Sequence, residues 1–182
     1  MRHEPEHVLR SYFRAKDENR PHLLEGVFSP GAELVVRNQS ANIEFPTVTQ
    51  GRAAIAEVLV RSFALAYENI YSFYLDRPGS AVREFNCAWL VAMSERASGK
   101  PRVGCGSYAW SFEPQPPCLA TRLVIAIEAM EVLPASETQA VLAWIGSLQY
   151  PWSSPQAALG GIPASGFLLP VARFLRRHVA VD

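Results

Sequence analysis

The sequence lacks a surplus of charge of either sign, and it lacks long apolar runs. Its 182 residues carry 17 Lys and Arg against 17 Asp and Glu, so the formal net charge is zero. General nucleic-acid binding needs a surplus of basic residues to neutralise phosphates, and this balance argues against such a partner. The longest uninterrupted apolar run, residues 87–93, is far shorter than the ~20 residues of a membrane-spanning helix. We therefore expect no membrane partner.

Cysteine is also scarce. Cys87, Cys105 and Cys118 are an odd number, and their separation excludes the close Cys and His spacing of zinc sites. Cys87 and Cys105 lie in apolar segments, which indicates buried free thiols and a reducing compartment. The charged N-terminal residues do not resemble a signal peptide. We expect a cytoplasmic protein with no metal and no cofactor.

Apolar residues, in contrast, make up 49% of the chain, enough for the large core of one domain. Their helical spacing predicts a first helix from Pro5 to about residue 17 and a short second helix from Pro21 to Phe28. A turn is expected at residues 29–31. The clearest helix follows Gly51, where one apolar stripe contains Ile55, Val58, Leu59, Phe63, Ala66 and Tyr67.

Alternating and aromatic-rich segments predict strands elsewhere. The predicted strands span residues 33–37, 43–45, 70–75, 85–96, 102–113 and 120–133. The last three are long and apolar, and residues 97–101 form a hairpin loop between the first two of them. We expect these strands to be the floor of a curved antiparallel sheet with the preceding helices on one face, which is an α+β fold.

The order of these elements and several motifs resemble the superfamily of nuclear transport factor 2, ketosteroid isomerase, scytalone dehydratase and the SnoaL-like polyketide cyclases. The residues that carry the resemblance are Tyr12, Asp17, Leu24, Val27, Phe28, Ala32, Gly51-Arg52-Ala53-Ala54-Ile55 and Tyr108-Ala109-Trp110-Ser111-Phe112. The match covers about residues 5–133. It implies a cystatin-like cone, a pocket between sheet and helices, and commonly a homodimer formed through the sheet.

Residues beyond the cone form a C-terminal extension. The spacing predicts a short helix at residues 141–148, Pro and Gly make residues 153–166 resemble a linker, and residues 167–179 form an amphipathic helix. We divide the chain into a cone-shaped α+β domain at 1–150 and a Pro/Gly-rich linker with a C-terminal helix at 151–182. The second segment is expected to pack on the cone or on a partner chain.

The resemblance to ketosteroid isomerase suggests part of a catalytic site. By ungapped spacing, the tyrosine that donates to the developing oxyanion falls on Tyr12, and its protonated carboxyl partner falls near Tyr108. The general base falls on Val36, which cannot accept a proton, so steroid-type isomerisation is disfavoured. No predicted strand contains His, and the catalytic histidines of the dehydratase branch therefore have no counterpart.

Glu128 is the candidate replacement for the missing base. Strand alternation puts Val124, Ala126, Glu128 and Met130 on one face. A carboxylate on an apolar pocket wall has a raised pKa suited to acid–base chemistry. The alternative is that this face is solvated or contacts a partner, with Glu128 paired to an arginine such as Arg122.

Tyr108, Trp110 and Phe112 share one face of the neighbouring strand with Gly104 and Gly106. The glycines either leave room for a ligand against an aromatic wall or permit the bend that a cone needs. The candidate ligand-binding residues are Tyr12, Tyr108, Trp110, Glu128 and Met130.

Three functions are compatible with these residues. The first is binding of a small apolar or carbonyl-bearing ligand in an aromatic-lined pocket. The second is an isomerase, cyclase or dehydratase that uses Tyr12 and Tyr108 as donors and Glu128 as base. The third is a dimeric interaction module whose cone is filled by its own side chains.

Overall fold

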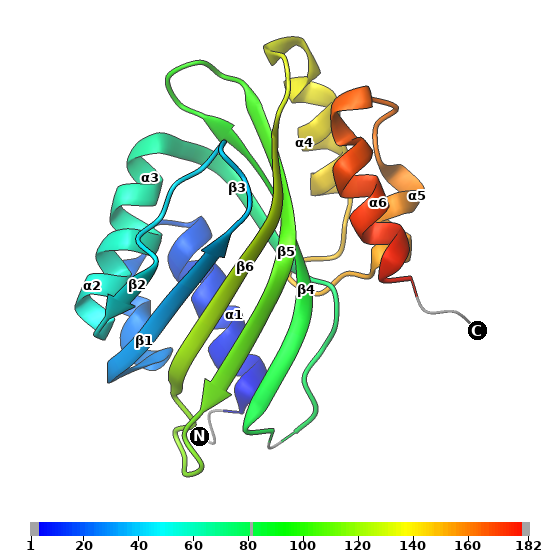
Figure 1. The fold of residues 1–182 in the computed structure, drawn as a ribbon. Coiled ribbons are helices and arrows are strands. Elements are labelled where there is room, and N and C mark those ends of the chain that lie inside the picture. The colour runs from blue at the N-terminus through cyan, green and yellow to red at the C-terminus, as the bar shows by residue number, and fades with distance from the viewer. Residues whose placement is uncertain (1–3, 81, 180–182) are drawn as a thin grey trace.

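One curved six-stranded sheet with helices on both faces organises the chain (Figure 1). The computed structural model describes residues 4–80 and 82–179. The strands are β1 (Phe28–Asn38), β2 (Val48–Gln50), β3 (Tyr67–Tyr74), β4 (Glu84–Glu95), β5 (Pro101–Phe112) and β6 (Ala120–Val132). Their order in the sheet is β2-β1-β6-β5-β4-β3. The expected α+β cone is confirmed, but the sheet is mixed, because β1 runs parallel to β6 while every other neighbouring pair is antiparallel.

The N-terminal helices cover the concave face of the sheet. They are α1 (Pro5–Asp17), the 3-10 helix η1 (Pro21–Gly26), α2 (Arg52–Ala56), the π-helical turn η2 (Glu57–Arg61) and α3 (Ser62–Ala66). Pro5 occupies the first turn of α1, where its missing N–H leaves no hydrogen bond unmade. The apolar face of α1 is fully buried against the sheet through Val8, Leu9, Tyr12 and Phe13.

The π turn changes which residues of the predicted long helix face the core. Ile55, Leu59 and Phe63 are buried as the spacing predicts. One extra residue in the turn rotates the helix, so Val60 is fully buried and Val58 only partly. The helix then ends one residue before Tyr67, which begins β3.

Two predicted segments between residues 28 and 50 differ in the structure. Residues 29–31 are not a separate turn but lie in an irregular stretch of β1, where the pairing with β6 shifts register between Phe28 and Glu33. The weak strand predicted at 43–45 is absent from the described residues, and β2 lies at Val48–Gln50 instead. The strand forms at residues 48–50 because Val48 and Thr49 pair with residues of β1.

The C-terminal extension covers the outer face of the sheet (Figure 1). It comprises η3 (Ala135–Glu137), α4 (Thr138–Gly146), α5 (Pro155–Gly161), η4 (Gly166–Leu168) and α6 (Leu169–Arg177). Side chains of α4 and α6 pack with Phe73, Leu90 and Cys105 of β3, β4 and β5 in a second apolar cluster. These strands are therefore buried on both faces.

The segment predicted as a linker, residues 153–166, contains α5. Ser154 caps this helix by accepting a hydrogen bond from the Ala157 N–H at 3.1 Å, and Pro155 follows at the first helical position. The Trp144 indole of α4 donates to the Ala158 carbonyl of α5 at 3.0 Å. The division of the chain at residue 150 stays a prediction, since α4, α5 and α6 pack in the same cluster.

In the described part of the chain, none of the helices combines the length and the apolar character that crossing a bilayer requires.

Candidate functional site

A small cavity lies between the N-terminal helices and the concave face of the sheet. Its volume is about 50 Å³. Its wall is mostly apolar and aromatic, and includes Val36, Phe45, Phe63, Trp89, Tyr108 and Met130. Such a volume holds a few water molecules, and a ligand the size of benzene, which needs a cavity of about 150 Å³, would have to displace side chains of the wall. Pockets for drug-sized ligands reach ~300–1,000 Å³. Most of the cone is filled by its own side chains.

A buried cation lies on this apolar wall. The Lys16 side chain lines the cavity, and the residue is only 6% exposed. Lys16 Nζ donates to Asp17 Oδ1 at 2.6 Å and to Ser72 Oγ at 2.7 Å. It also lies 5.3 Å from the centre of the Phe63 ring, a cation–π distance. The charge of Lys16 is therefore neutralised and fixed in place where the cavity is otherwise apolar.

Asp17 and Ser72 complete this polar cluster. The Ser72 N–H donates to Asp17 Oδ2 at 2.9 Å, and the Ser72 hydroxyl donates to Asp17 Oδ1 at 2.9 Å. Burial raises the pKa of Asp17, while Lys16 and Ser72 act in the opposite direction. From the C-terminal extension, Tyr150 Oη lies 3.5 Å from Asp17 Oδ2 and limits its access to water. The extension thus contributes to the cone site.

Local structure explains why these side chains meet. Tyr12 and Lys16 are four residues apart in α1 and therefore share one face of the helix. Ser72 and Tyr74 point to the concave side of β3, and Phe73 between them points to the outer cluster. The last turn of α1 packs beside β3, which brings Ser72 to the end of the helix.

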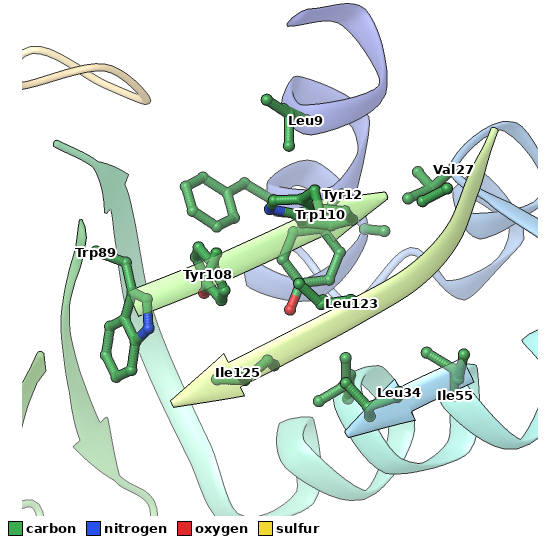
Figure 2. Packing of buried hydrophobic residues seen from close by; sticks show 14 of the residues in the cluster. Leu9, Tyr12, Val27, Leu34, Ile55, Trp89, Tyr108, Trp110, Leu123 and Ile125 are labelled. Atoms are coloured by element: carbon green, nitrogen blue, oxygen red, sulfur yellow. The ribbon is translucent and has the colours of Figure 1, made fainter. Parts of the chain in front are cut away.

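Two residues that line the cavity have a buried donor without a well-formed hydrogen bond. Among the described residues, neither Tyr12 Oη nor Trp89 Nε1 makes a hydrogen bond of normal geometry. Burial raises the pKa of both Tyr12 and Tyr108, so both hydroxyls are neutral at physiological pH. The two hydroxyls also interact with each other, which lowers the pKa of Tyr12 and raises that of Tyr108. Figure 2 shows Tyr12 of α1 against Tyr108 and Trp110 of β5, with Trp89 on the next strand. Buried donors are rarely left without acceptors, so these two point to a ligand or to bound water.

The structure places the predicted site residues in three different environments. Tyr12, Tyr108 and Met130 line the cavity. Trp110 packs behind Tyr12, with ring centres 5.1 Å apart, and does not line it. Glu128 lies on the outer face, where its carboxylate forms an ion pair with Arg177 of α6 at 2.6 Å. The structure therefore does not bring Glu128 together with Tyr12 and Tyr108.

A β-bulge explains the position of Glu128. Gly106 pairs with Ile127 and Cys105 with Ala129, so Glu128 is an extra residue in β6. After the bulge, the residues of β6 that face the cavity are those with even numbers instead of odd numbers. Ile127 and Met130 both reach the cavity, and the predicted grouping of Glu128 with Met130 on one face is wrong.

Gly104 and Gly106 do not open space for a ligand. A Cβ at Gly106 would come within 1.9 Å of the Ala126 carbonyl oxygen, and one at Gly104 within 2.4 Å of the Met130 side chain. Both glycines instead permit close packing beside the bulge, so the expectation that they leave room for a ligand is wrong.

Four residues of the site were not predicted as site residues from the sequence, namely Lys16, Asp17, Ser72 and Trp89. The one available signal was the helical spacing of Lys16 from Tyr12. Val36, at the position expected for a base, contributes only an apolar side chain to the wall. Within residues 4–80 and 82–179, no three His, Cys, Asp or Glu side chains gather as a metal site requires.

Comparisons with known proteins bear on the fold. No family model matches the chain, and no curated protein matches its sequence. Its structure is similar to a putative isomerase from Rhodopseudomonas palustris, with 18% identity, a TM-score of 0.56, and 69% of this chain and 92% of that protein covered. An NTF2-like protein from Burkholderia thailandensis has 13% identity, a TM-score of 0.54, and 76% and 98% covered.

A hexachlorocyclohexane dehydrochlorinase is also similar, with 12% identity, a TM-score of 0.54, and 70% and 84% of the two chains covered. At such identities the likeness concerns the fold and not the activity. The region left unmatched by each of these structures is about a quarter to a third of this chain. Together with the sheet order and the helices on its concave face, these similarities show that the chain has the cone-shaped nuclear transport factor 2-like fold.

Proposed function

We propose that this protein binds a small, mainly apolar molecule that carries a carbonyl or carboxylate oxygen. One observation carries the proposal: Tyr12 and Trp89, whose buried donors make no hydrogen bond of normal geometry among the described residues, line the same cavity as Lys16. A ligand oxygen would give these donors an acceptor, and the aromatic wall would contact the rest of the molecule.

The affinity for such a ligand would depend on the exclusion of water from the hydrogen bonds around Lys16. Hydrogen bonds to a charged group are shorter and about twice as strong as neutral ones, and exclusion of water increases their electrostatic contribution. Lys16 is already held by Asp17 and Ser72, so little side-chain freedom is lost when a ligand binds.

The small volume of the cavity favours a second candidate, a filled cone that serves as an interaction module. An isomerase, cyclase or dehydratase that uses Glu128 has weaker support, because the Glu128 carboxylate lies on the opposite face of the sheet. Two of the similar proteins are a putative isomerase and a dehydrochlorinase, but their identity to this chain is too low to transfer a reaction.

Binding can be tested through the Trp89 indole N–H, which nuclear magnetic resonance observes directly. The probes are butanone, butyrate and benzoate, with toluene as an apolar comparison. We expect the Trp89 signal to shift on titration with the three oxygen-bearing probes and much less with toluene. The Trp144 indole is a matched internal control, since it is bonded to Ala158 under the outer face and should not move.

Substitution of the donors tests the assignment further. Tyr12→Phe should weaken binding of butyrate about threefold to tenfold, which corresponds to one lost hydrogen bond. The proposal fails if none of the probes shifts the Trp89 signal at concentrations that leave the protein folded. It also fails if the Trp144 signal moves equally, and the filled-cone module would then be preferred.

Two further expectations remain predictions. A cytoplasmic, reducing location agrees with the two buried free thiols, Cys87 and Cys105. A homodimer would have to use a surface other than the outer face of β4 and β5, which α4 and α6 cover. Sedimentation velocity at micromolar concentration measures the oligomeric state.

A further inference from the structure

The choice of lysine at the cavity is unusual for this chain. Of its 17 basic residues, only Lys16 and Lys100 are lysines, and the other 15 are arginines. Lys100 lies in the exposed hairpin between β4 and β5. Lys16 therefore places a primary amine in the interior of a protein that otherwise uses guanidinium groups almost everywhere.

An amine and a guanidinium group differ in chemistry more than in charge. Both can pair with a carboxylate, and the guanidinium group does so with better geometry. Only the amine can lose a proton readily and attack a carbonyl carbon. Lysine at this position therefore offers a nucleophile that arginine would not.

The neighbours of Lys16 fit such chemistry. Two of the three Nζ donor positions are used by Asp17 and Ser72, and the side chain borders the cavity. Asp17 Oδ1, at 2.6 Å, is close enough to take a proton from Nζ and to return it. Tyr12 lines the same cavity, and its neutral hydroxyl makes no hydrogen bond of normal geometry among the described residues, although it approaches the Tyr108 hydroxyl.

We propose that Lys16 forms a reversible imine with the carbonyl carbon of a small aldehyde or ketone held in the cone. This inference rests on the proposed function and makes it narrower, since it assigns the ligand to carbonyl compounds rather than carboxylates. Lys16 is then the nucleophile, Asp17 the proton carrier, and Tyr12 a donor to the carbonyl oxygen.

The proton and bond changes balance without any other reactant. The ammonium group of Lys16 transfers a proton to the Asp17 carboxylate, and the free amine attacks the carbonyl carbon. The carbonyl π electrons move to its oxygen, which the Tyr12 hydroxyl stabilises while a proton from nitrogen neutralises it. Asp17 then protonates the hydroxyl group of this carbinolamine, the C–O bond breaks, and one water leaves. The product is a protonated imine beside an Asp17 carboxylate.

Reductive trapping tests the step on the unmodified protein. Butanal or benzaldehyde is added with sodium cyanoborohydride, and peptide mass mapping locates the resulting alkyl groups. Lys100 serves as the exposed reference amine within the same molecule. We expect labelling of Lys16 to saturate with aldehyde concentration and to exceed that of Lys100 about tenfold at low concentration, because binding holds the aldehyde beside Nζ.

Protection by butyrate links the label to the cavity. Butyrate cannot form an imine, and it should slow the labelling of Lys16 while leaving that of Lys100 unchanged. Lys100→Arg should still be labelled at Lys16, whereas Lys16→Arg should lose the saturating label. The comparison between the two lysines needs no variant, so it holds even if Lys16→Arg does not fold.

Each outcome is decisive. If butyrate shifts the Trp89 signal but Lys16 is not labelled, the imine is excluded and the proposed binding function stands. If Lys16 is labelled no faster than Lys100 and without saturation, the imine is likewise excluded. If no probe binds and Lys16 is not labelled, both proposals fail.

Discussion

Lys16 Nζ donates a hydrogen bond of 2.7 Å to Ser72 Oγ, which joins the end of α1 to β3 across 56 residues of sequence. The same serine donates to Asp17 through its backbone N–H and its hydroxyl group. One small side chain therefore stabilises both members of a buried ion pair, whose side chains are 8% and 4% exposed.

Ser72→Ala should reduce the free energy of unfolding by about 1–3 kcal/mol, because buried charged groups lose a hydrogen-bond partner. Urea denaturation measures the change. Ser62→Ala is the matched control, since Ser62 Oγ bonds to Glu57 at an exposed position and its loss should cost less than about 0.5 kcal/mol. Equal losses in the two variants would show that the cluster contributes nothing special.

Tyr12→Phe should change stability by less than about 0.5 kcal/mol, because the buried Tyr12 hydroxyl makes no hydrogen bond of normal geometry among the described residues and only approaches Tyr108. Tyr74→Phe is the contrasting variant. Its hydroxyl donates to the Leu9 carbonyl at 3.0 Å, and its loss should cost about 1 kcal/mol. The effects on the affinity for butyrate should be reversed: Tyr12→Phe should weaken binding, and Tyr74→Phe should leave it unchanged. A destabilised Tyr12→Phe protein would mean that the hydroxyl has a structural partner.

Gly106→Ala should destabilise the protein by about 3 kcal/mol or more, because the new Cβ would meet the Ala126 carbonyl and the Trp89 ring at 1.9 and 2.8 Å. Gly146→Ala is the control, since nothing lies within 4 Å of its Cβ position near the end of α4. Thermal unfolding of the two variants compares them directly. Similar melting temperatures would contradict the close approach at Gly106.

Glu128→Gln should leave butyrate binding unchanged and reduce stability by less than about 1 kcal/mol, since its ion pair with Arg177 is partly exposed. Titration of the Trp89 signal and urea denaturation test the two parts. A large loss of binding would restore Glu128 as a site residue and would require the bulge in β6 to rearrange.

Only Cys118 should react quickly with a thiol reagent in the native protein at pH 8, and all three cysteines should react after unfolding. Burial raises the pKa of Cys105 to about 12 and that of Cys87 still further, so neither forms a thiolate at this pH. Since these folded pKa values are raised, the stability they contribute is complete below about pH 8.5 and is lost as the pH rises toward 12. Fast reaction of two or three native thiols would contradict this.

The sequence predicted the sheet better than the site. β4, β5 and β6 were predicted to within one residue, because their apolar and alternating patterns extend over many positions. β1 was predicted to start five residues too late, and its parallel pairing with β6 was not expected. The bulge at Glu128 and the π turn at η2 were not found, since each inserts one residue through tertiary pairing and leaves no local signal. These two insertions decided which side chains face the cavity.

Lys16 was missed for a different reason. A lysine near the end of a helix is usually solvated and complements the helix dipole, and only contact with β3 makes this one internal. Helix α5 was not predicted because its segment is rich in Pro and Gly. Ser154 and Pro155 nevertheless match the pattern of a helix N-terminus.

The parallel pairing of β1 with β6 has a consequence for synthesis on the ribosome. β1 ends at Asn38, but β6, the strand with which it pairs, spans Ala120–Val132. The six-stranded sheet therefore cannot be completed until most of the chain has been translated. The outer face of β4 and β5 then stays uncovered until α4 and α6 emerge. Nascent chains that stall between these points would expose an apolar sheet face, and such exposed surface favours aggregation with other chains.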